Sequence, residues 1–343
     1  MKRGPARVLE ALRAAAGPCS GQALSEQLGV TRTQVWKHVE ALRRRGYAIE
    51  GEPGGGYRLV SLPDRLYPQE IRVALDTRWL ARDIEHYEEV DSTNRVAFAR
   101  GQEGAAHGHT VIAEGQSAGR GRLGRSFFSP PHLNLYTSIL LRPPIDVADA
   151  PTLIPAAAIA VADAVAETLG APDAVEIKWP NDVLVGGLKT IGILMELQAE
   201  ATRVGFAVLG IGVNLNVDPA LFPEDFRRTA TSLRAHAGHP IARTAFACRL
   251  YSILERVLDE HAAGGFDALR PRYEARFRMV GRRVRVLQGD AVGTGSHAQR
   301  ATAIEGTVRG VDTDGALLLA GRRGESLRVI AGDVTLAKED APT

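Results

Sequence analysis

Three amphipathic helices followed by a hairpin are predicted for the first 60 residues. The third helix is the best defined, because a capping box at residues 31–34 precedes an apolar stripe with spacing i, i+4 and i+7. Two short strands around a glycine-rich turn follow. This order is typical of a winged helix-turn-helix. The positions that support it are Val8, Leu9, Leu12, Ala23, Leu24, Leu28, Val35, Val39 and Leu42 in the helices, and residues 47–50 and 57–60 in the strands.

The polar face of the third helix carries side chains suited to DNA. Basic and hydrogen-bonding groups near the N-terminus of such a helix are what reading of the major groove requires. We expect Trp36 to pack in the core rather than stack on a base. The alternative is a winged-helix module that contacts only other proteins. The candidate DNA-binding residues are Arg32, Thr33, Lys37 and His38, with Arg44 on the same face.

A proline-bounded linker, residues 61–68, separates this module from the rest of the chain. A helix around residues 69–75 and a strand around residues 86–90 are expected next. Asp91-Ser92-Thr93-Asn94 then precedes a helix that runs through Phe98. Local evidence favours N-cap chemistry for these four residues, although a helix N-terminus is also a ready donor site.

A loop rich in glycine and arginine, residues 116–125, lies between two apolar strands, residues 110–114 and 133–141. Its glycines let the backbone approach a ligand closely, and its arginines supply permanently charged donors for phosphate or carboxylate. The loop matches G-x-G-x-x-G, but Pro130-Pro131 and an extended run follow, so no helix opens at the third glycine as a dinucleotide site requires. We therefore predict an anion-binding loop, with a solvated basic loop as the alternative.

Residues 175–197 read as a strand, a proline break, a strand, a Gly-Gly turn and a strand. Lys178 and Lys189 lie in otherwise apolar strands, where an unpaired ammonium group is costly. A lone strand lysine often protects a sheet edge or reaches solvent. Because Asn181 and Asp182 lie at the strand junction, a polar pocket is the better interpretation.

The remaining segments complete the predicted architecture. An alanine-rich core helix, without chemistry, is expected at residues 151–169, and a strand at 203–216 ends in Gly-x-Gly-x-Asn, where Asn214 is either a nucleotide contact or part of a tight turn. Residues 218–231 look like a mobile loop, and helices are expected around residues 244–261 and 266–277. From Gly281 the pattern alternates, which indicates short strands of a small β-barrel. The predicted domains are residues 1–62, 63–279 and 280–343.

Composition narrows the class of protein. A chain of 343 residues predicts two or three domains. Ten Lys and Arg against five Asp and Glu concentrate positive charge in the first 60 residues. Cys19 and Cys248 are far apart and suit packed thiols in a reducing cytoplasm. No signal peptide is visible, no apolar run approaches the roughly 20 residues of a membrane span, and no membrane association is expected.

Two candidate metal positions are set aside. His107 and His109 flank a glycine without further ligands at suitable spacing, so we expect a solvated turn. Asp312 and Asp314 precede Gly315 and are interpreted as turn residues rather than calcium ligands.

At these motifs the sequence resembles the biotin–protein ligases, specifically the bifunctional bacterial type that is also the biotin operon repressor. The resemblance extends over nearly the whole chain. It implies an α+β multidomain fold: the winged helix, a central class II synthetase-like mixed sheet with helices, and an SH3-like β-barrel. Its matching segments, in the family's order, are residues 91–94, the GRGRLGR loop at 119–125, Lys178-Trp179-Pro180-Asn181-Asp182, residues 189–194 and residues 210–216.

The resemblance also implies a two-step reaction. The carboxylate of biotin attacks the α-phosphate of ATP, accompanied by Mg²⁺, and pyrophosphate leaves. A lysine of a biotin carboxyl carrier domain then attacks the adenylate and AMP leaves. Residues 218–231 would help to cover the adenylate, and the adenylate would promote a homodimer that binds a two-fold operator.

Roles for individual residues follow from this resemblance. Lys189 would bridge the carboxylate and the α-phosphate, Arg122 would retain the adenylate, and Asp182 would orient Mg²⁺ or the incoming lysine. Leu123 departs from the usual loop, where another arginine is common. Contacts with biotin or its adenylate are expected from Ser92, Thr93, Asn94, Gln116, Arg120, Gly121, Arg122 and Lys189, and contacts with ATP from Arg125, Lys178, Trp179, Asn181 and Asn214.

Three alternatives stay open at this point. A lipoate–protein ligase shares the general fold and the adenylation chemistry, although the GRGRLGR loop and the winged helix argue against it. A biotin-responsive transcription factor without ligase activity would bind DNA but release no AMP. A ligase whose N-terminal module no longer binds an operator would retain all of the catalytic motifs.

Overall fold

The computed structural model describes residues 3–52, 55–288 and 302–336. The chain divides into two compact units, Met1–Arg65 and Leu66–Thr343. Residues 53 and 54 of the predicted wing turn lie outside the described part of the chain.

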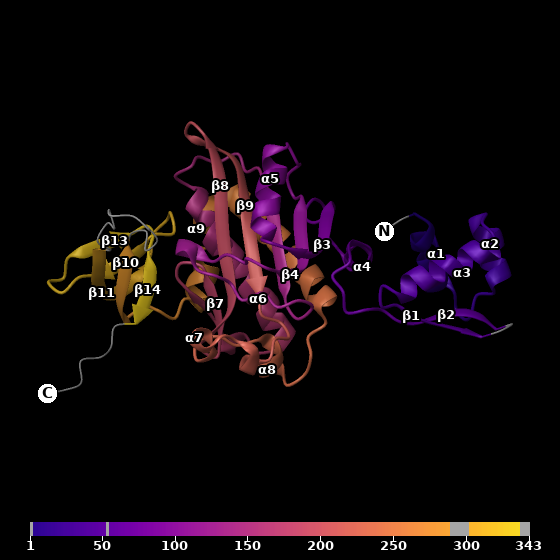
Figure 1. Cartoon of the computed structure of the whole chain (residues 1–343). Coiled ribbons are helices and arrows are strands. Elements are labelled where there is room, and N and C mark those ends of the chain that lie inside the picture. Colours follow the sequence, from indigo (N-terminus) through magenta and orange to yellow (C-terminus); the bar gives the residue numbers. More distant parts are fainter. Residues whose placement is uncertain (1–2, 53–54, 289–301, 337–343) are drawn as a thin grey trace, which may run out of the picture. The chain divides into compact units, whose positions relative to one another are not determined.

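The first unit is the predicted winged helix-turn-helix (Figure 1). Ser20 caps α2 by accepting a hydrogen bond from the Ala23 N–H, and Gly29 ends this helix with φ 65°. Both hydrogen bonds of the predicted capping box are present at the start of α3. The elements are α1 (Arg3–Ala14), α2 (Gly21–Leu28), α3 (Arg32–Arg43), β1 (Ala48–Glu52) and β2 (Gly56–Ser61).

The expectation for Trp36 is wrong. Its side chain is 51% exposed, whereas Val35, Val39 and Leu42 are fully buried. The apolar stripe of α3 therefore ends beside Trp36 instead of including it.

The second unit is organised around a seven-stranded mixed sheet with the strand order β3-β4-β5-β9-β8-β7-β6. Only β3 and β4 pair in parallel, and the other neighbours are antiparallel. The predicted mixed sheet is confirmed. Its strands are β3 (Ile84–Val90), β4 (Thr110–Gln116), β5 (Leu135–Leu141), β6 (Val175–Lys178), β7 (Asp182–Val185), β8 (Leu188–Glu200) and β9 (Arg203–Val213).

Helices cover both faces of this sheet. On one face, α6 (Leu153–Leu169) and α9 (Arg243–Arg276) pack together and form the main core with the sheet. On the other face, α5 (Thr93–Gln102) packs on β4, β5 and β9. The two predicted helices of residues 244–277 form α9, which breaks at Gly265, where φ is 64°. The short elements are α4 (Pro68–Ala74), α7 (Glu224–Arg227), α8 (Leu233–Ala237) and the 3-10 turns Arg122–Gly124, Ala150–Thr152, Pro172–Ala174 and Pro219–Leu221.

Two expectations about these segments need correction. No apolar run was expected to approach the length of a membrane span, but residues 150–169 are long and apolar enough to cross a membrane; 72% of this stretch is buried, as in the predicted core helix. The segment predicted as a mobile loop contains a 3-10 turn and α7, and it is anchored by a small cluster in which Val217, Phe222 and Ala230 are buried. The packing of these apolar side chains therefore holds the segment in a defined conformation.

The C-terminal part is a five-stranded antiparallel sheet, so the predicted all-β character is confirmed. Its core is continuous with that of the central sheet, and the Trp179 indole N–H donates to the Gly315 carbonyl at 2.9 Å. The last strand is β14 (Asp333–Leu336). The other strands are β10 (Arg283–Gln288), β11 (Thr302–Val311), β12 (Leu317–Ala320) and β13 (Ser326–Val329).

Candidate functional site

A cavity of about 510 Å³ lies beside the central strands of the large sheet. The glycine-arginine loop, the end of β4, the N-terminus of α5 and the β7–β8 hairpin all contribute to it. The structure thus brings together segments separated by up to a hundred residues in the sequence. The predicted residues that line it are Ser92, Thr93, Asn94, Gln116, Arg120, Gly121, Arg122, Arg125, Lys178, Asn181, Asp182 and Lys189.

Two residues assigned to ATP lie outside this lining. The Trp179 side chain is 3% exposed and contacts the C-terminal sheet. Asn214 is also buried, and its side chain lies 3.4 Å from the amide nitrogen of Asn134. Both residues therefore support the walls of the site, and the expectation that they contact the nucleotide stays a prediction.

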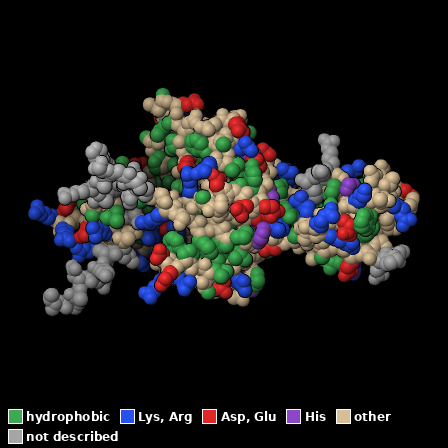
Figure 2. Space-filling model, in the orientation of Figure 1, with side chains coloured by type: hydrophobic (Ala, Val, Ile, Leu, Met, Phe, Trp, Pro, Cys, Tyr) green, Lys and Arg blue, Asp and Glu red, His purple; other side chains and the backbone are tan. Residues whose placement is uncertain are grey.

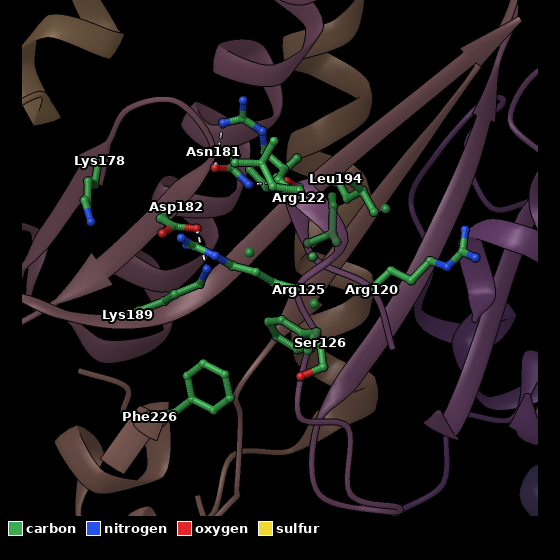
Figure 3. Close-up of a pocket in the computed structure, with 18 of the residues that line it drawn as sticks. Arg120, Arg122, Arg125, Ser126, Lys178, Asn181, Asp182, Lys189, Leu194 and Phe226 are labelled. Atoms are coloured by element: carbon green, nitrogen blue, oxygen red, sulfur yellow. Dashed lines mark hydrogen bonds and ion pairs between the residues drawn. The ribbon is translucent and has the colours of Figure 1, made fainter. Parts of the chain in front are cut away.

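Lys189 reaches the cavity from the start of β8. Gly186 and Gly187 both have positive φ, as a tight hairpin between β7 and β8 requires. The Lys189 Nζ lies 2.7 Å from Asp182 Oδ1 (Figure 3). The Lys189 N–H donates to the Thr229 carbonyl, and the Thr231 N–H donates to the Lys189 carbonyl. The backbone of this lysine is thus fixed on both sides while its amine faces the cavity.

The Asp182 oxygen that Lys189 contacts is Oδ1, and this contact is electrostatic. Asp182 Oδ1 is buried and has no aligned hydrogen bond, although the ammonium group is close to it. The contact is therefore an ion pair rather than a directed hydrogen bond. A single carboxylate of this kind suits Mg²⁺, which binds to proteins through one or two carboxylates and keeps phosphate and water ligands.

The glycine-arginine loop folds back on itself. The Gly121 N–H donates to the Arg125 carbonyl at 2.7 Å, and the Phe127 N–H donates to the Gly119 carbonyl at 2.8 Å. No α-helix follows Gly124, as expected, and a single 3-10 turn contains Leu123 with φ 54°. A left-handed conformation costs a non-glycine residue about 1–2 kcal/mol.

The loop arginines point to different parts of the cavity. One Arg122 nitrogen lies 3.4 Å from both the Asn181 Oδ1 and the Gly332 carbonyl. Arg120 extends in the opposite direction to a loose contact of 3.9 Å with Glu196, whereas Arg125 extends toward Asp182 and Lys189 (Figure 3). Positive charge is thus distributed along the cavity instead of being gathered at one point.

A polar network closes the end of the cavity near α5. Gln116 accepts hydrogen bonds from the Thr93 N–H at 2.9 Å and from the Thr93 hydroxyl at 3.2 Å. Ser138 donates to Asn94 at 2.6 Å, and Asn94 donates to Glu196 at 2.9 Å. These groups present both donors and acceptors, as recognition of a polar heterocycle requires.

This network corrects the N-cap interpretation of residues 91–94. The Ser92 side chain makes no capping hydrogen bond, and the Gln116 side chain takes the Thr93 N–H instead. Ser92, Thr93 and Asn94 are all buried and line the cavity. Their side chains therefore serve the pocket more than the helix.

Two glycines of β9 make room for this arrangement. A Cβ on Gly210 would lie 2.0 Å from Asn94 Oδ1, and a Cβ on Gly212 would lie 2.7 Å from the Phe127 ring. The small residues of the Gly-x-Gly pattern thus allow neighbouring side chains, rather than the ligand alone, to approach the strand.

Several contributors to the site escaped the sequence analysis. Ser138 and Glu196 join through strand pairing, and no local motif marks either residue. Phe226, Arg228 and Thr229 come from the segment around α7, and Gly332, Val334 and Thr335 come from the C-terminal sheet. The sequence analysis marked the first group only as part of the segment, residues 218–231, that the resemblance places over the adenylate.

The cavity is strongly cationic. Five predicted cations, Arg120, Arg122, Arg125, Lys178 and Lys189, line it together with Arg228, and Asp182 is the only acidic residue in the part of the lining that the structure describes. Such a site favours ligands with several negative charges.

Beneath the cavity, β4 carries a buried ion pair. Glu114 Oε2 lies 2.9 Å from an Arg243 nitrogen, and both side chains are fully buried. Burial raises the pKa of Glu114, but hydrogen bonding from His86, the charge of Arg243 and the Leu66 N–H outweigh it and lower this pKa to about 2. Glu114 is therefore ionised and holds β4 two residues before Gln116.

The histidine segment differs from its prediction. His109 is buried and lies 2.7 Å from Asp83, so the expected solvated turn is wrong at this residue. Burial lowers the pKa of His107. Within the described part of the chain, no group of three or more His, Cys, Asp or Glu residues is arranged to hold a metal ion.

The first unit presents a basic surface, and Figure 2 shows Lys and Arg side chains spread over the visible face of this unit. Arg32, Thr33 and Lys37 are exposed on α3, as predicted. His38 is half-buried and lies so close to Gly4 of α1 that a Cβ there would be 2.5 Å from its ring. His38 therefore packs against α1, and its assignment to DNA stays a prediction.

Comparison with known proteins agrees with both parts of this description. Residues 87–214 match the Biotin/lipoate A/B protein ligase family, and residues 6–58 match the HTH domain. The chain is 35% identical to the "Bifunctional ligase/repressor BirA" of Bacillus subtilis (strain 168) over 92% of its length and 93% of that protein. It is 33% identical to the protein of the same name from Escherichia coli (strain K12), over 88% of this chain and 87% of that one.

A solved structure also resembles this chain. The biotin protein ligase from Aquifex aeolicus, determined in complex with biotin and ATP, superposes with a TM-score of 0.60 at 25% identity. The match covers 75% of this chain and 99% of that one.

Proposed function

This chain belongs to the family of the bifunctional ligase/repressor BirA, and we propose that it is an ATP-dependent biotin–protein ligase that also represses transcription through its winged helix. The observation that carries the proposal is the convergence of the GRGRLGR loop, Asp182 and Lys189 on one cationic cavity. The acceptor would be the lysine of a biotin carboxyl carrier domain, and the reaction would take place in the cytoplasm.

In the first step, a biotin carboxylate oxygen forms a bond to the α-phosphorus of ATP, and the bond to the bridging oxygen breaks as pyrophosphate leaves. Two anions must approach each other, so cations that are already in place lower the barrier. Lys189 is fixed by its backbone and by Asp182, and its amine would lie between the carboxylate and the α-phosphate. A positioned group of this kind is worth about 3–4 kcal/mol.

The two ends of the cavity suit the two ends of the adenylate. The network of Thr93, Asn94 and Gln116 would bind the ureido ring of biotin, with Ser92 beside it. Arg120, Gly121 and Arg122 would contact the biotinoyl and phosphate groups. Arg125, Lys178 and Asn181 would bind the nucleotide.

Mg²⁺ would enter with ATP. Asp182 is the carboxylate of the cavity that could hold it, and the ion would neutralise charge on the phosphates. Asp182 itself holds the Lys189 amine in the cavity, whichever oxygen faces the metal.

In the second step, the amine of the acceptor lysine forms an amide bond with the biotinoyl carbon, and the carbon–oxygen bond to AMP breaks. The amine loses a proton, and AMP leaves as an anion. Arg122, tied to Asn181 and to the Gly332 carbonyl, would keep the adenylate bound until the acceptor arrives.

Repression would follow from the same ligand. An adenylate that orders the glycine-arginine loop would make a nearby surface competent to form a homodimer, and a dimer presents two winged helices to a two-fold operator. Thr33 and Lys37 would contact bases or phosphates from α3.

The test is the transfer of biotin to a purified biotin carboxyl carrier domain. With biotin, ATP and Mg²⁺, the carrier mass is expected to increase by one biotinoyl group, and AMP should appear in equal amount. Equivalent labelling with lipoate, or labelling with lipoate alone, would contradict the proposal. Biotin-dependent DNA binding without AMP would show a sensor that lacks ligase activity.

A further inference from the structure

A groove of about 600 Å³ crosses the first unit beside the exposed Trp36. It lies between α3, the N-terminal end of α2 and the β1–β2 hairpin. Trp36 and Arg32 line it from α3, and Tyr57 lines it from β2. A tryptophan left half-exposed in such a place calls for a partner, because large aromatic side chains normally contribute their area to a core or an interface.

The groove is rich in hydrogen-bond donors. Among the described residues, none provides a hydrogen-bond partner for the Arg32 guanidinium, the Thr33 hydroxyl, the Trp36 indole N–H or the Tyr57 hydroxyl. In the part of the chain that the structure describes, the lining contains two arginines and no Asp or Glu. This chemistry favours an anionic occupant with apolar parts.

The walls of the groove approach each other at Gly21, which has no side chain. A Cβ on Gly21 would lie 3.6 Å from the Tyr57 ring and 3.9 Å from Arg32 Nε. Behind them, Arg43 donates to the Ile49 carbonyl at 2.7 Å and 2.9 Å and pairs with Glu40 at 2.7 Å. The positive charge of Arg43 is therefore held in place, whereas that of Arg32 is available to a ligand.

We propose that this groove holds one sugar–phosphate strand of a DNA duplex. The Arg32 guanidinium pairs with a phosphate, and the rings of Trp36 and Tyr57 pack on the deoxyriboses on either side. The inference rests on the proposed repressor function and assigns to Trp36 a role in affinity rather than in sequence reading. Contacts to the backbone position a protein on the duplex but carry no sequence information themselves.

The test uses the full chain with biotin and ATP, and two fluorescein-labelled duplexes of unrelated sequence. Trp36→Ala and Arg32→Ala should each weaken binding to both duplexes by the same factor, about tenfold. Arg32→Ala should lower the slope of log Kd against log salt concentration by about one, because one phosphate contact is lost. Trp36→Ala should leave that slope unchanged, and Trp36→Phe should restore most of the affinity.

Arg58→Ala is the matched control. Arg58 follows Tyr57 on β2, so its side chain points to the opposite face of the hairpin, where it pairs with Glu50 at 2.6 Å. Its loss should leave DNA affinity nearly unchanged.

Two outcomes would overturn the groove assignment alone. In one, the unaltered protein binds DNA and the Trp36 and Arg32 variants bind it equally well. In the other, Trp36→Ala changes the ratio of affinities for the two duplexes, which indicates base reading. If the unaltered protein binds neither duplex at low salt, the repressor function fails, and the groove assignment fails with it.

Discussion

Arg122 is the loop arginine with the most defined surroundings, since one of its nitrogens lies near both the Asn181 side chain and the Gly332 carbonyl. These two neighbours come from the β6–β7 junction and from the C-terminal sheet. They hold the guanidinium over the cavity before any ligand arrives. Pre-positioning of this kind is what retention of a reactive adenylate requires.

Arg122→Gly should therefore let the adenylate escape. The expected result is biotin attached to lysines of bystander proteins such as serum albumin, measured by mass spectrometry after incubation with biotin and ATP. Arg58→Gly, which changes an arginine of the other unit, serves as the control. Labelling that stays confined to the carrier domain would show that Arg122 does not retain the adenylate.

Glu114 gives a residue-scale prediction about acid stability. Its pKa in the folded protein is about 2, below the ordinary value of 4.5. A lowered pKa means that the carboxylate contributes stability above pH 4.5, and that this contribution is lost as the pH falls from 4.5 toward 2. Glu114→Gln should lower the free energy of unfolding at pH 7 by about 3–5 kcal/mol, because the buried charge of Arg243 loses its counter-charge.

Urea denaturation at pH 7 and at pH 3.5 measures this effect. The difference between the unaltered protein and Glu114→Gln should be smaller at the lower pH. A difference that stays constant across this range would show that the ionised carboxylate is not the source of the stability.

At the scale of elements, the sequence predicted single helices and hairpins better than the contacts between elements that are distant in the chain. The helices of the first unit and the β7–β8 hairpin follow from caps, spacing and glycine pairs, which act over a few residues. Lys189 was identified as a candidate site residue because a lysine within an apolar hairpin is unusual. Ser138 was not found, because it reaches Asn94 only through the pairing of distant strands.

The wrong predictions, like the missed Ser138, arise from tertiary contacts that no local pattern reveals. Trp36 looked apolar enough for the core, but the stripe of α3 packs on α1 and α2 without it. The residues at 92–94 have the composition of an N-cap, but the tertiary partner Gln116 replaces the cap. The contribution of the C-terminal sheet to the cavity depends on packing across many residues, and no local pattern indicates it.

The β9 strand offers an element-scale prediction. Gly210→Ala places a methyl group where Asn94 Oδ1 now lies, so Asn94 must move and the polar network must rearrange. The KM for biotin should rise about tenfold, the equivalent of one lost hydrogen bond, whereas the KM for ATP should change little. Steady-state kinetics with each substrate varied in turn provides the measurement.

Gly205→Ala is the control on the same strand. A Cβ there would lie 3.1 Å from the Oε1 of Glu200, a flexible side chain that can move aside, and 3.3 Å from the Gln198 carbonyl, and neither residue lines the cavity. Its kinetic constants should match those of the unaltered protein. An equal rise of both KM values in Gly210→Ala would indicate a general distortion of the sheet rather than a loss at the biotin end.

At the scale of the whole molecule, one ligand is proposed to couple the activities of the two compact units. The first unit carries the basic α3 face, and the second carries the cationic cavity. If the adenylate binds in the second unit, as proposed, its effect must be passed on to the first unit, and a shift from monomer to dimer would do this.

The protein is therefore expected to bind duplex DNA more tightly when biotin and ATP are both present, with a parallel shift from monomer to dimer. Analytical ultracentrifugation and fluorescence anisotropy measure the two effects on one sample. Lys178→Ala, which leaves the first unit unchanged, should reduce both effects together if Lys178 contributes to nucleotide binding. DNA affinity that does not depend on the ligands would contradict the link between the units.

The central claim is that the cationic loop and Lys189 meet in one cavity where biotin is adenylated. Biotin-dependent exchange of radiolabelled pyrophosphate into ATP tests it most directly, because this exchange needs only the first step. The unaltered protein should show exchange that requires biotin, and Lys189→Ala, with its fold verified by circular dichroism, should lose about a hundredfold or more of that rate. Exchange in Lys189→Ala at a near-normal rate would contradict the account.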